Sequence, residues 1–344
     1  MQKDLSTKKL GRTGYMGKNY KVKIIRNEFR NGKIIEIGKD DLKFSDQELI
    51  EHIVTCGLPM SKVNVNFLEK HRLEMAYKCY LVKMALQVDQ NGYIMVSDNI
   101  KHLDPSEKSF VSYYIGMFIT KIISKKKFGF EYLVHLNTVK KNAAVISGKR
   151  EPDLVGYNLN DKNYALFEVK GRQTNYISKS VINSANKQLQ SVISIDGEQP
   201  GEKIICITYP VKENNELKCV ITLQNKWKLS GKASTEKLKK DQLLYSYYLP
   251  VYKLIKEQKS NNVENECEFE LEGNIESKDK ETEANGRCKI KMAKKLYDIF
   301  DKQADSESIE LIQRLENELK DDKDILTVQY IGSEQFLDTY KKTV

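Results

Sequence analysis

Residues 151–172, EPDLVGYNLNDKNYALFEVKGR, constrain the fold of this chain more than any other stretch. They predict a short strand, a polar turn and a second strand, which together form a β-hairpin. Side chains alternate along a strand, so Phe167 and Val169 share an apolar face that suits a core. Glu168 and Lys170 share the opposite face, roughly 7 Å apart by strand rise. A carboxylate and an ammonium in an otherwise apolar strand need a chemical reason.

The segments around the hairpin predict an α/β core. Residues 103–127 have a Pro-Ser start and apolar residues at helical spacing, which predicts one long helix. A strand is expected within 130–139 and a helix within 178–195. Two further strands are expected at 203–210 and 217–224. Helix, strands, helix and strand in this order predict a mixed central sheet flanked by helices.

An acid, Asp153, opens the first strand of the hairpin. It lies opposite Glu168 if the hairpin register allows, so that two carboxylates and a lysine converge at one end of the sheet. Two carboxylates hold Mg²⁺ through hard oxygen ligands, and the backbone carbonyl of Val169 is positioned as a further ligand. Lys170 can orient an attacking water or offset charge in the transition state. Gly171 would permit close approach of a phosphate backbone.

Pro152-Asp153, fourteen intervening residues and Glu168-Val169-Lys170 resemble the PD-(D/E)xK nuclease superfamily, which has the restriction-endonuclease-like fold. The resemblance covers about 101–222. It implies that Asp153 and Glu168 bind the metal and that Lys170 is the catalytic lysine. It also implies an acid on the helix before the hairpin and a Gln on the helix after it. The best match for the acid is Glu107, and the second is Glu131. The match for the Gln is Gln188, beside Lys187.

Each of these assignments has a purely structural alternative. The (D/E)xK triplet alone recurs six times elsewhere in the chain, and Glu168 with Lys170 could form a solvated cross-strand ion pair on an edge hairpin. Glu107 could stabilise the first turn of its helix through the helix dipole. Gln188 could belong to an ordinary polar helix face.

The charge pattern favours a nucleic-acid partner. The chain carries a formal charge of +9, and residues 101–150 hold ten Lys or Arg against three acids. A basic rim around an acidic metal centre suits binding of a phosphate backbone. The expected rim residues are Lys125, Lys126, Lys127, Lys149, Arg150 and Arg172. A solvated helix end rich in lysine is the alternative.

The order of the segments divides the chain into four parts. Residues 1–100 predict an α+β region for recognition or partner contacts, and 101–256 the nuclease-like domain. Residues 257–283 hold ten acids against three bases, which predicts an acidic linker or mobile insert over 257–290, although ECEFELEG allows a short strand. Residues 291–344 predict a C-terminal helical extension with a late strand.

These observations predict a metal-dependent nuclease that uses Mg²⁺, with Mn²⁺ as a substitute, and that prefers DNA to RNA. A restriction or antiviral defence role rests on the superfamily alone. The alternative is a non-catalytic nucleic-acid-binding or assembly module on the same fold. A homodimer or a partner subunit of a defence complex is compatible with either.

The sequence also bears on location. The six cysteines show no CxxC spacing, which predicts reduced thiols in a cytoplasmic protein. No run approaches the roughly 18 apolar residues of a membrane span.

Overall fold

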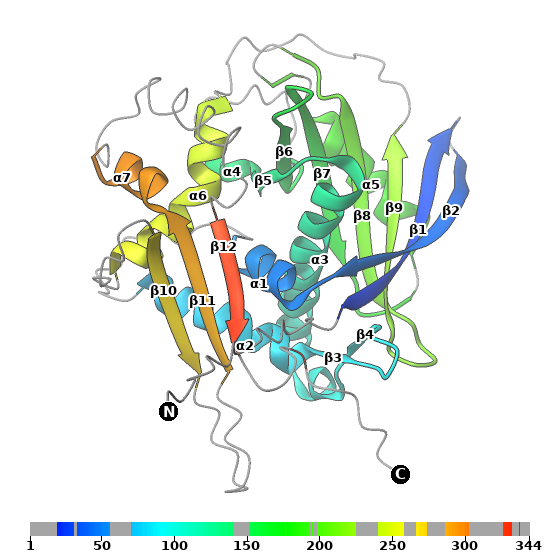
Figure 1. The fold of residues 1–344 in the computed structure, drawn as a ribbon. Coiled ribbons are helices and arrows are strands. Elements are labelled where there is room, and N and C mark those ends of the chain that lie inside the picture. The colour runs from blue at the N-terminus through cyan, green and yellow to red at the C-terminus, as the bar shows by residue number, and fades with distance from the viewer. Residues whose placement is uncertain are drawn as a thin grey trace, which may run out of the picture.

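The computed structural model describes residues 19–30, 33–55, 70–139, 151–175, 177–192, 194–195, 198–224, 240–257, 266–273, 286–302, 326–331 and 337. These residues form an α/β structure built on a seven-stranded mixed sheet with the order β2-β1-β9-β8-β7-β6-β5 (Figure 1). The strands of this sheet are β1 (Tyr20–Arg30), β2 (Lys33–Phe44), β5 (Tyr132–His135), β6 (Leu154–Asn158), β7 (Asn163–Gly171), β8 (Glu202–Pro210) and β9 (Leu217–Gln224). The α/β class and the mixed sheet expected from the sequence are therefore confirmed.

The sheet combines hairpins with two parallel contacts. The pairs β7–β8 and β1–β9 are parallel, whereas β5–β6, β6–β7, β8–β9 and β1–β2 are antiparallel. The central strand β8 is buried from Lys203 to Tyr209, as its continuous apolar run predicts. At one edge, β2 pairs with β1 alone among the described strands, and Ile34, Ile35 and Ile37 on it are exposed.

The long helix α3 (Pro105–Phe128) packs on one face of the sheet, against β7 and β8. It begins with a capping box in which Asp104 accepts hydrogen bonds from the backbone of Ser106 and Glu107, and Pro105 starts the first turn. It ends at Gly129, whose φ of +73° is the left-handed conformation that glycine adopts readily. Helix α5 (Lys179–Gln190) covers β7 and β8 on the opposite face.

Two strands from the described residues before 100 are part of the same sheet. Strands β1 and β2 lie at one side of it, and α1 (Asp46–Val54) packs on α3. The structure thus carries the seven-stranded sheet across the expected boundary at residue 100. Helix α2 (Lys70–Ala85), the two-stranded ladder β3 (Leu86–Val88) and β4 (Ile94–Val96), and the short 3₁₀ helix η2 (Asp98–His102) follow before α3.

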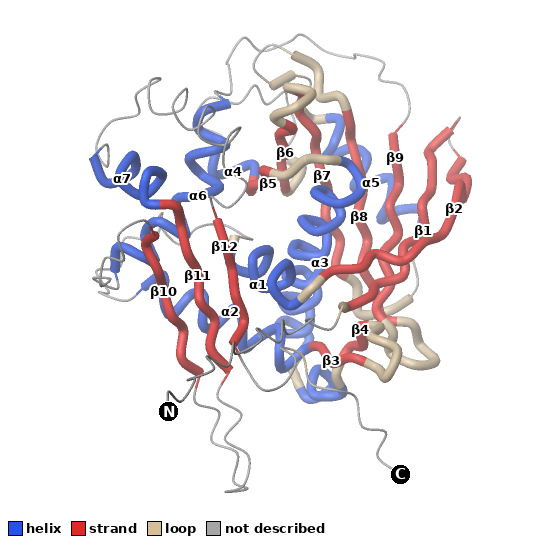
Figure 2. Tube along the Cα trace, in the orientation of Figure 1, coloured by secondary structure: helices blue, strands red, loops and turns tan. Residues whose placement is uncertain are grey.

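A second sheet of three antiparallel strands contacts α1 and α6 (Lys240–Glu257) on the side away from the main sheet (Figure 2). Its strands are β10 (Glu266–Gly273), β11 (Gly286–Ala293) and β12 (Leu326–Ile331). Strand β10, which is the ECEFELEG stretch, and the first residues of β11 lie within the segment 257–290, and the two strands pair antiparallel. The remaining helices are α4 (Leu136–Val139) and α7 (Lys294–Lys302). No helix among the described residues is long and apolar enough to cross a membrane.

Candidate active site

The β6–β7 hairpin brings the two predicted acids together. Its ladder ends with Leu154 paired to Phe167, so Asp153, one residue before β6, lies opposite Glu168. One carboxylate oxygen of Asp153, Oδ2, accepts a hydrogen bond from the backbone N–H of Val169 at 2.8 Å. This bond fixes the Asp153 carboxylate at the end of the sheet, beside the carboxyl group of Glu168.

Lys170 and Gln188 complete the cluster. The Nζ of Lys170 donates to Oε1 of Glu168 and, at 3.1 Å, to Oε1 of Gln188 on α5. The amide nitrogen of Gln188 donates in turn to the backbone carbonyl of Glu151, at 3.0 Å. Gln188 therefore connects the lysine to the segment that leads into β6. The side chain of Glu168 has no exposed surface, whereas 27% of the Lys170 side chain is exposed, so solvent reaches the cluster from the lysine side.

Burial changes the acidity of Glu168. Removal of its carboxyl group from water is the largest cause that raises its pKa, to about 8 from the usual 4.5. The neighbouring charge of Asp153 raises the pKa further, and the Lys170 ammonium offsets part of this rise. The Oε2 atom of Glu168 is buried and has no hydrogen-bond partner in the structure. An ionised carboxylate in this position is therefore short of positive charge and of hydrogen-bond donors.

The opposite face of β7 packs against α3. A Cβ on Gly116 of α3 would lie 2.9 Å from Val169 Cγ1, and a Cβ on Gly171 would lie 1.8 Å from the carbonyl oxygen of Ser112. Gly171 thus accommodates the backbone of α3, and the close approach expected for a phosphate is made here by a helix. This contact also positions Tyr113, whose hydroxyl donates to Oδ1 of Asp153 at 3.2 Å.

The acids expected from the helix do not join this cluster. The side chain of Glu107 accepts a hydrogen bond from the backbone N–H of Asp104 at 3.0 Å, so it closes the capping box of α3 and is exposed. Glu131 lies 3.4 Å from Lys125. The structure thus places the Glu107 carboxylate at the start of its own helix, and its role as a metal ligand stays a prediction.

Much of the expected basic rim is neutralised by acids of the N-terminal region. Lys125, Lys126 and Lys127 contact Glu51, Glu48 and Asp40 at 3.3, 2.7 and 2.8 Å respectively. These lysines join the end of α3 to α1 and β2, so their charges are paired with acids of the chain, and their contact with nucleic acid stays a prediction. Lys149 and Arg150 lie outside the described residues. Arg172 lies directly after β7, and its backbone N–H donates to Thr208 at 2.8 Å.

The donor set of the cluster suits a hard divalent cation. Asp153 and Glu168 supply carboxylate oxygens, and the unpartnered Oε2 of Glu168 is a buried acceptor that such a cation would satisfy. The described residues contain no group of three or more His, Cys, Asp or Glu side chains at metal-binding distance. A cation here would therefore use two carboxylates, with the Val169 carbonyl as the predicted third protein ligand.

Two contacts of the cluster were not predicted from the sequence. These are the hydroxyl of Tyr113 on Asp153 and the carbonyl of Glu151 on Gln188. Tyrosine at a helical position carries no signal that separates it from core packing, and a backbone carbonyl carries none at all. Both depend on how α3 and α5 pack on the sheet.

Comparison with known proteins identifies no relative. No family model, no curated protein and no solved structure matches this chain.

Proposed function

We propose that this protein is a metal-dependent nuclease that hydrolyses phosphodiester bonds, with DNA favoured over RNA as its substrate. The helix, hairpin, helix and strand around Asp153, Glu168 and Lys170 support a restriction-endonuclease-like core. The arrangement of these three side chains supports the chemistry. A role in restriction or antiviral defence and a cytoplasmic location are parts of this proposal that rest on resemblance and composition.

Each residue of the cluster has its own role in the proposed reaction. Asp153 and Glu168 would hold Mg²⁺ or Mn²⁺, together with the carbonyl of Val169. A bound cation of this kind acidifies water and stabilises charge on phosphoryl oxygens. Lys170, held by Gln188 and partly exposed, is placed to donate a hydrogen bond to the attacking water or to a phosphate oxygen. Tyr113 and the Val169 N–H keep the Asp153 carboxylate in one orientation.

One observation carries this proposal. Glu168 is buried beside a second carboxylate, and its Oε2 atom has no partner. If position 168 only had to pack in the core, an apolar side chain would suit it better, because burial of an acid disfavours its charged form. A divalent cation supplies the positive charge that the two acids lack, and a phosphate oxygen can share that cation.

Cleavage of nucleic acid in the presence and absence of metal tests the proposal. Wild type should nick or degrade plasmid DNA with Mg²⁺ or Mn²⁺ and lose this activity in EDTA. Glu168→Gln and Lys170→Ala should each lower the rate by about 100-fold or more, because each removes a group that contacts the metal or the reacting phosphate. Single-stranded DNA and RNA of the same sequence serve as parallel substrates.

Glu36→Gln and Lys39→Ala provide matched controls. These residues form an exposed ion pair at 3.2 Å on β2, and the substitutions are of the same types. They should leave cleavage unchanged. Metal-independent binding of nucleic acid with no cleavage by wild type would instead identify a binding or assembly module. Cleavage that survives Glu168→Gln would contradict the assignment of the site.

A further inference from the structure

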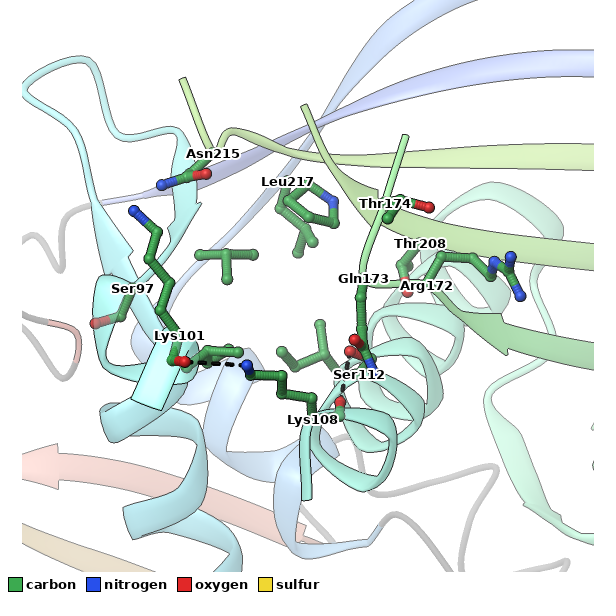
Figure 3. A pocket seen from close by; sticks show the side chains of 14 residues that line it. Ser97, Lys101, Lys108, Ser112, Arg172, Gln173, Thr174, Thr208, Asn215 and Leu217 are labelled. Atoms are coloured by element: carbon green, nitrogen blue, oxygen red, sulfur yellow. Dashed lines mark hydrogen bonds between the residues drawn. The ribbon is translucent and has the colours of Figure 1, made fainter. Parts of the chain in front are cut away.

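A cavity of about 310 Å³ lies at the end of β7, on the α3 side of the sheet (Figure 3). Lys101 of η2, Lys108 of α3 and Arg172 after β7 line it, together with Asn215 and the apolar side chains of Ile100 and Leu217. Its volume is within the range of pockets that bind small molecules. It is distinct from the acid cluster, because none of Asp153, Glu168 and Lys170 lines it.

The cavity is positively charged. No Asp or Glu is among its lining residues. Lys101 pairs with Asp98 at 2.6 Å, but neither Lys108 nor Arg172 has a carboxylate within ion-pair distance among the described residues. Lys108 donates to the carbonyl of Lys101 at 3.0 Å, which leaves two of its three protons for another acceptor. This differs from the three neutralised lysines at the other end of α3.

Arg172 adds an unsatisfied donor at the wall of the cavity. Its Nε is buried and has no hydrogen-bond partner in the structure. Figure 3 shows Arg172 on the opposite side of the cavity from Lys101, with its guanidinium directed outward. The guanidinium therefore points away from the space that the other lining side chains surround.

The apolar part of the lining suits the flat surface of a nucleobase. Ile100 and Leu217 supply this surface, the side chain of Gln173 lies on the same side of the cavity as Ser112, and Asn215 lies across the cavity from Lys108. An apolar surface with a few polar groups and a cation at one end matches the parts of a nucleotide, which has a base and a phosphate.

The cavity and the candidate active site lie on different faces of β7. Lys170 contacts Gln188 of α5, whereas the cavity is lined by Lys108, Ser112 and Ile115 of α3. We propose that the cavity binds one nucleotide of the substrate strand, with the phosphate group on Lys108 and the base on Ile100 and Leu217. This inference rests on the proposed nuclease function and adds a second contact for the strand.

Binding measured in EDTA tests the cavity separately from cleavage. The probe is a short fluorescently labelled single-stranded oligodeoxynucleotide, and anisotropy gives Kd at several KCl concentrations. Lys108→Ala should weaken binding about 5- to 10-fold at low salt and reduce the slope of log Kd against log salt by about 0.7, as expected for one lost phosphate contact with a single strand. Ile100→Trp, which fills the cavity and keeps its charge, should weaken binding by a similar factor without changing the slope.

Lys39→Ala is the charge control, because it removes a lysine from the distant strand β2; it should change neither Kd nor slope. The inference is wrong if Lys108→Ala has the same Kd and slope as wild type, or if Ile100→Trp has the same Kd as wild type. Circular dichroism of each variant confirms that it is folded. If wild type does not cleave DNA but Lys108→Ala and Ile100→Trp still weaken binding as expected, the proposed nuclease activity is wrong and the cavity remains a nucleotide-binding site.

A free deoxynucleoside 5′-monophosphate, titrated by calorimetry, distinguishes the two sources of a nucleotide. Weak binding of the monophosphate relative to the oligonucleotide supports a strand site. Binding of the monophosphate that is lost in Lys108→Ala, together with unchanged oligonucleotide binding, would show that the cavity takes a free nucleotide and would overturn the strand assignment.

Discussion

At the scale of single residues, the environment of Glu168 determines the behaviour of the site. The carboxyl is buried, faces a second acid and is partly compensated by Lys170, with the result that its pKa rises to about 8. Between about pH 4.5 and 8 the folded protein therefore holds a proton on Glu168 that the unfolded chain has released. In this window the folded state binds more protons, so the free energy of unfolding falls as pH rises.

The first prediction concerns this pH dependence. In metal-free wild type, the free energy of unfolding should fall between about pH 5 and 8, on the order of a few kcal/mol. Glu168→Gln should not show this fall. Denaturant unfolding at several pH values in EDTA measures it, with Glu36→Gln as the exposed control. Mg²⁺ or Mn²⁺ should stabilise wild type at pH 8 more than it stabilises Glu168→Gln. Parallel pH profiles of wild type and Glu168→Gln would contradict the assigned environment.

At the scale of secondary-structure elements, the contact between α3 and β7 sets the geometry of the site. The N-terminal half of α3 lies on Val169 and Gly171, and this contact places Tyr113 against Asp153. The contact depends on two glycines, Gly116 and Gly171, because a side chain on either would meet the facing element.

The second prediction follows from this close approach. Gly171→Ala should destabilise the protein by about 3 kcal/mol, because its Cβ would lie 1.8 Å from the backbone oxygen of Ser112 and the helix must move. Thermal and denaturant unfolding measure the change. Gly201→Ala is the control, since its Cβ would lie 3.2 Å from the end of the flexible Asn163 side chain, and its stability should change little. Equal stabilities of the two variants would show that α3 adapts without cost.

Elements with strong local signals could be predicted from the sequence. The alternation in β7 predicted the hairpin, and the apolar run of β8 predicted a buried strand. The same logic left two readings of Glu107, because an acid after Asp-Pro-Ser suits the first turn of a helix as well as a metal site, and in the structure its carboxylate closes the capping box. Pairings between distant parts of the chain, such as Lys127 with Asp40 or β1 with β9, leave no local signal.

At the scale of the whole molecule, the sheet joins the N-terminal residues to the segment that carries the site. Strand β1 pairs in parallel with β9, and Tyr114 of α3 donates to the carbonyl of Ile53 at the end of α1. The lysines at the end of α3 contact acids of the same N-terminal region. Strand β1 and helix α1 are thus part of the support of the site.

The third prediction tests this dependence. A fragment that spans residues 101–256 should fail to unfold cooperatively, because β9 would lose β1 on one side and α3 would lose its partners on α1. Circular dichroism melting and amide exchange compare it with the full chain. A cooperative transition with slow exchange in β8 and β9 would show instead that the segment folds alone, and would support a division at residue 100.

The outer strand β2 has a practical consequence for handling the protein. Its free side offers backbone groups flanked by three exposed isoleucines, which lie among the charged residues Lys33, Glu36 and Lys39. These charges oppose edge-to-edge pairing, so concentrated samples should associate through this edge when salt screens them, and a lysine in place of Ile35 should reduce that association.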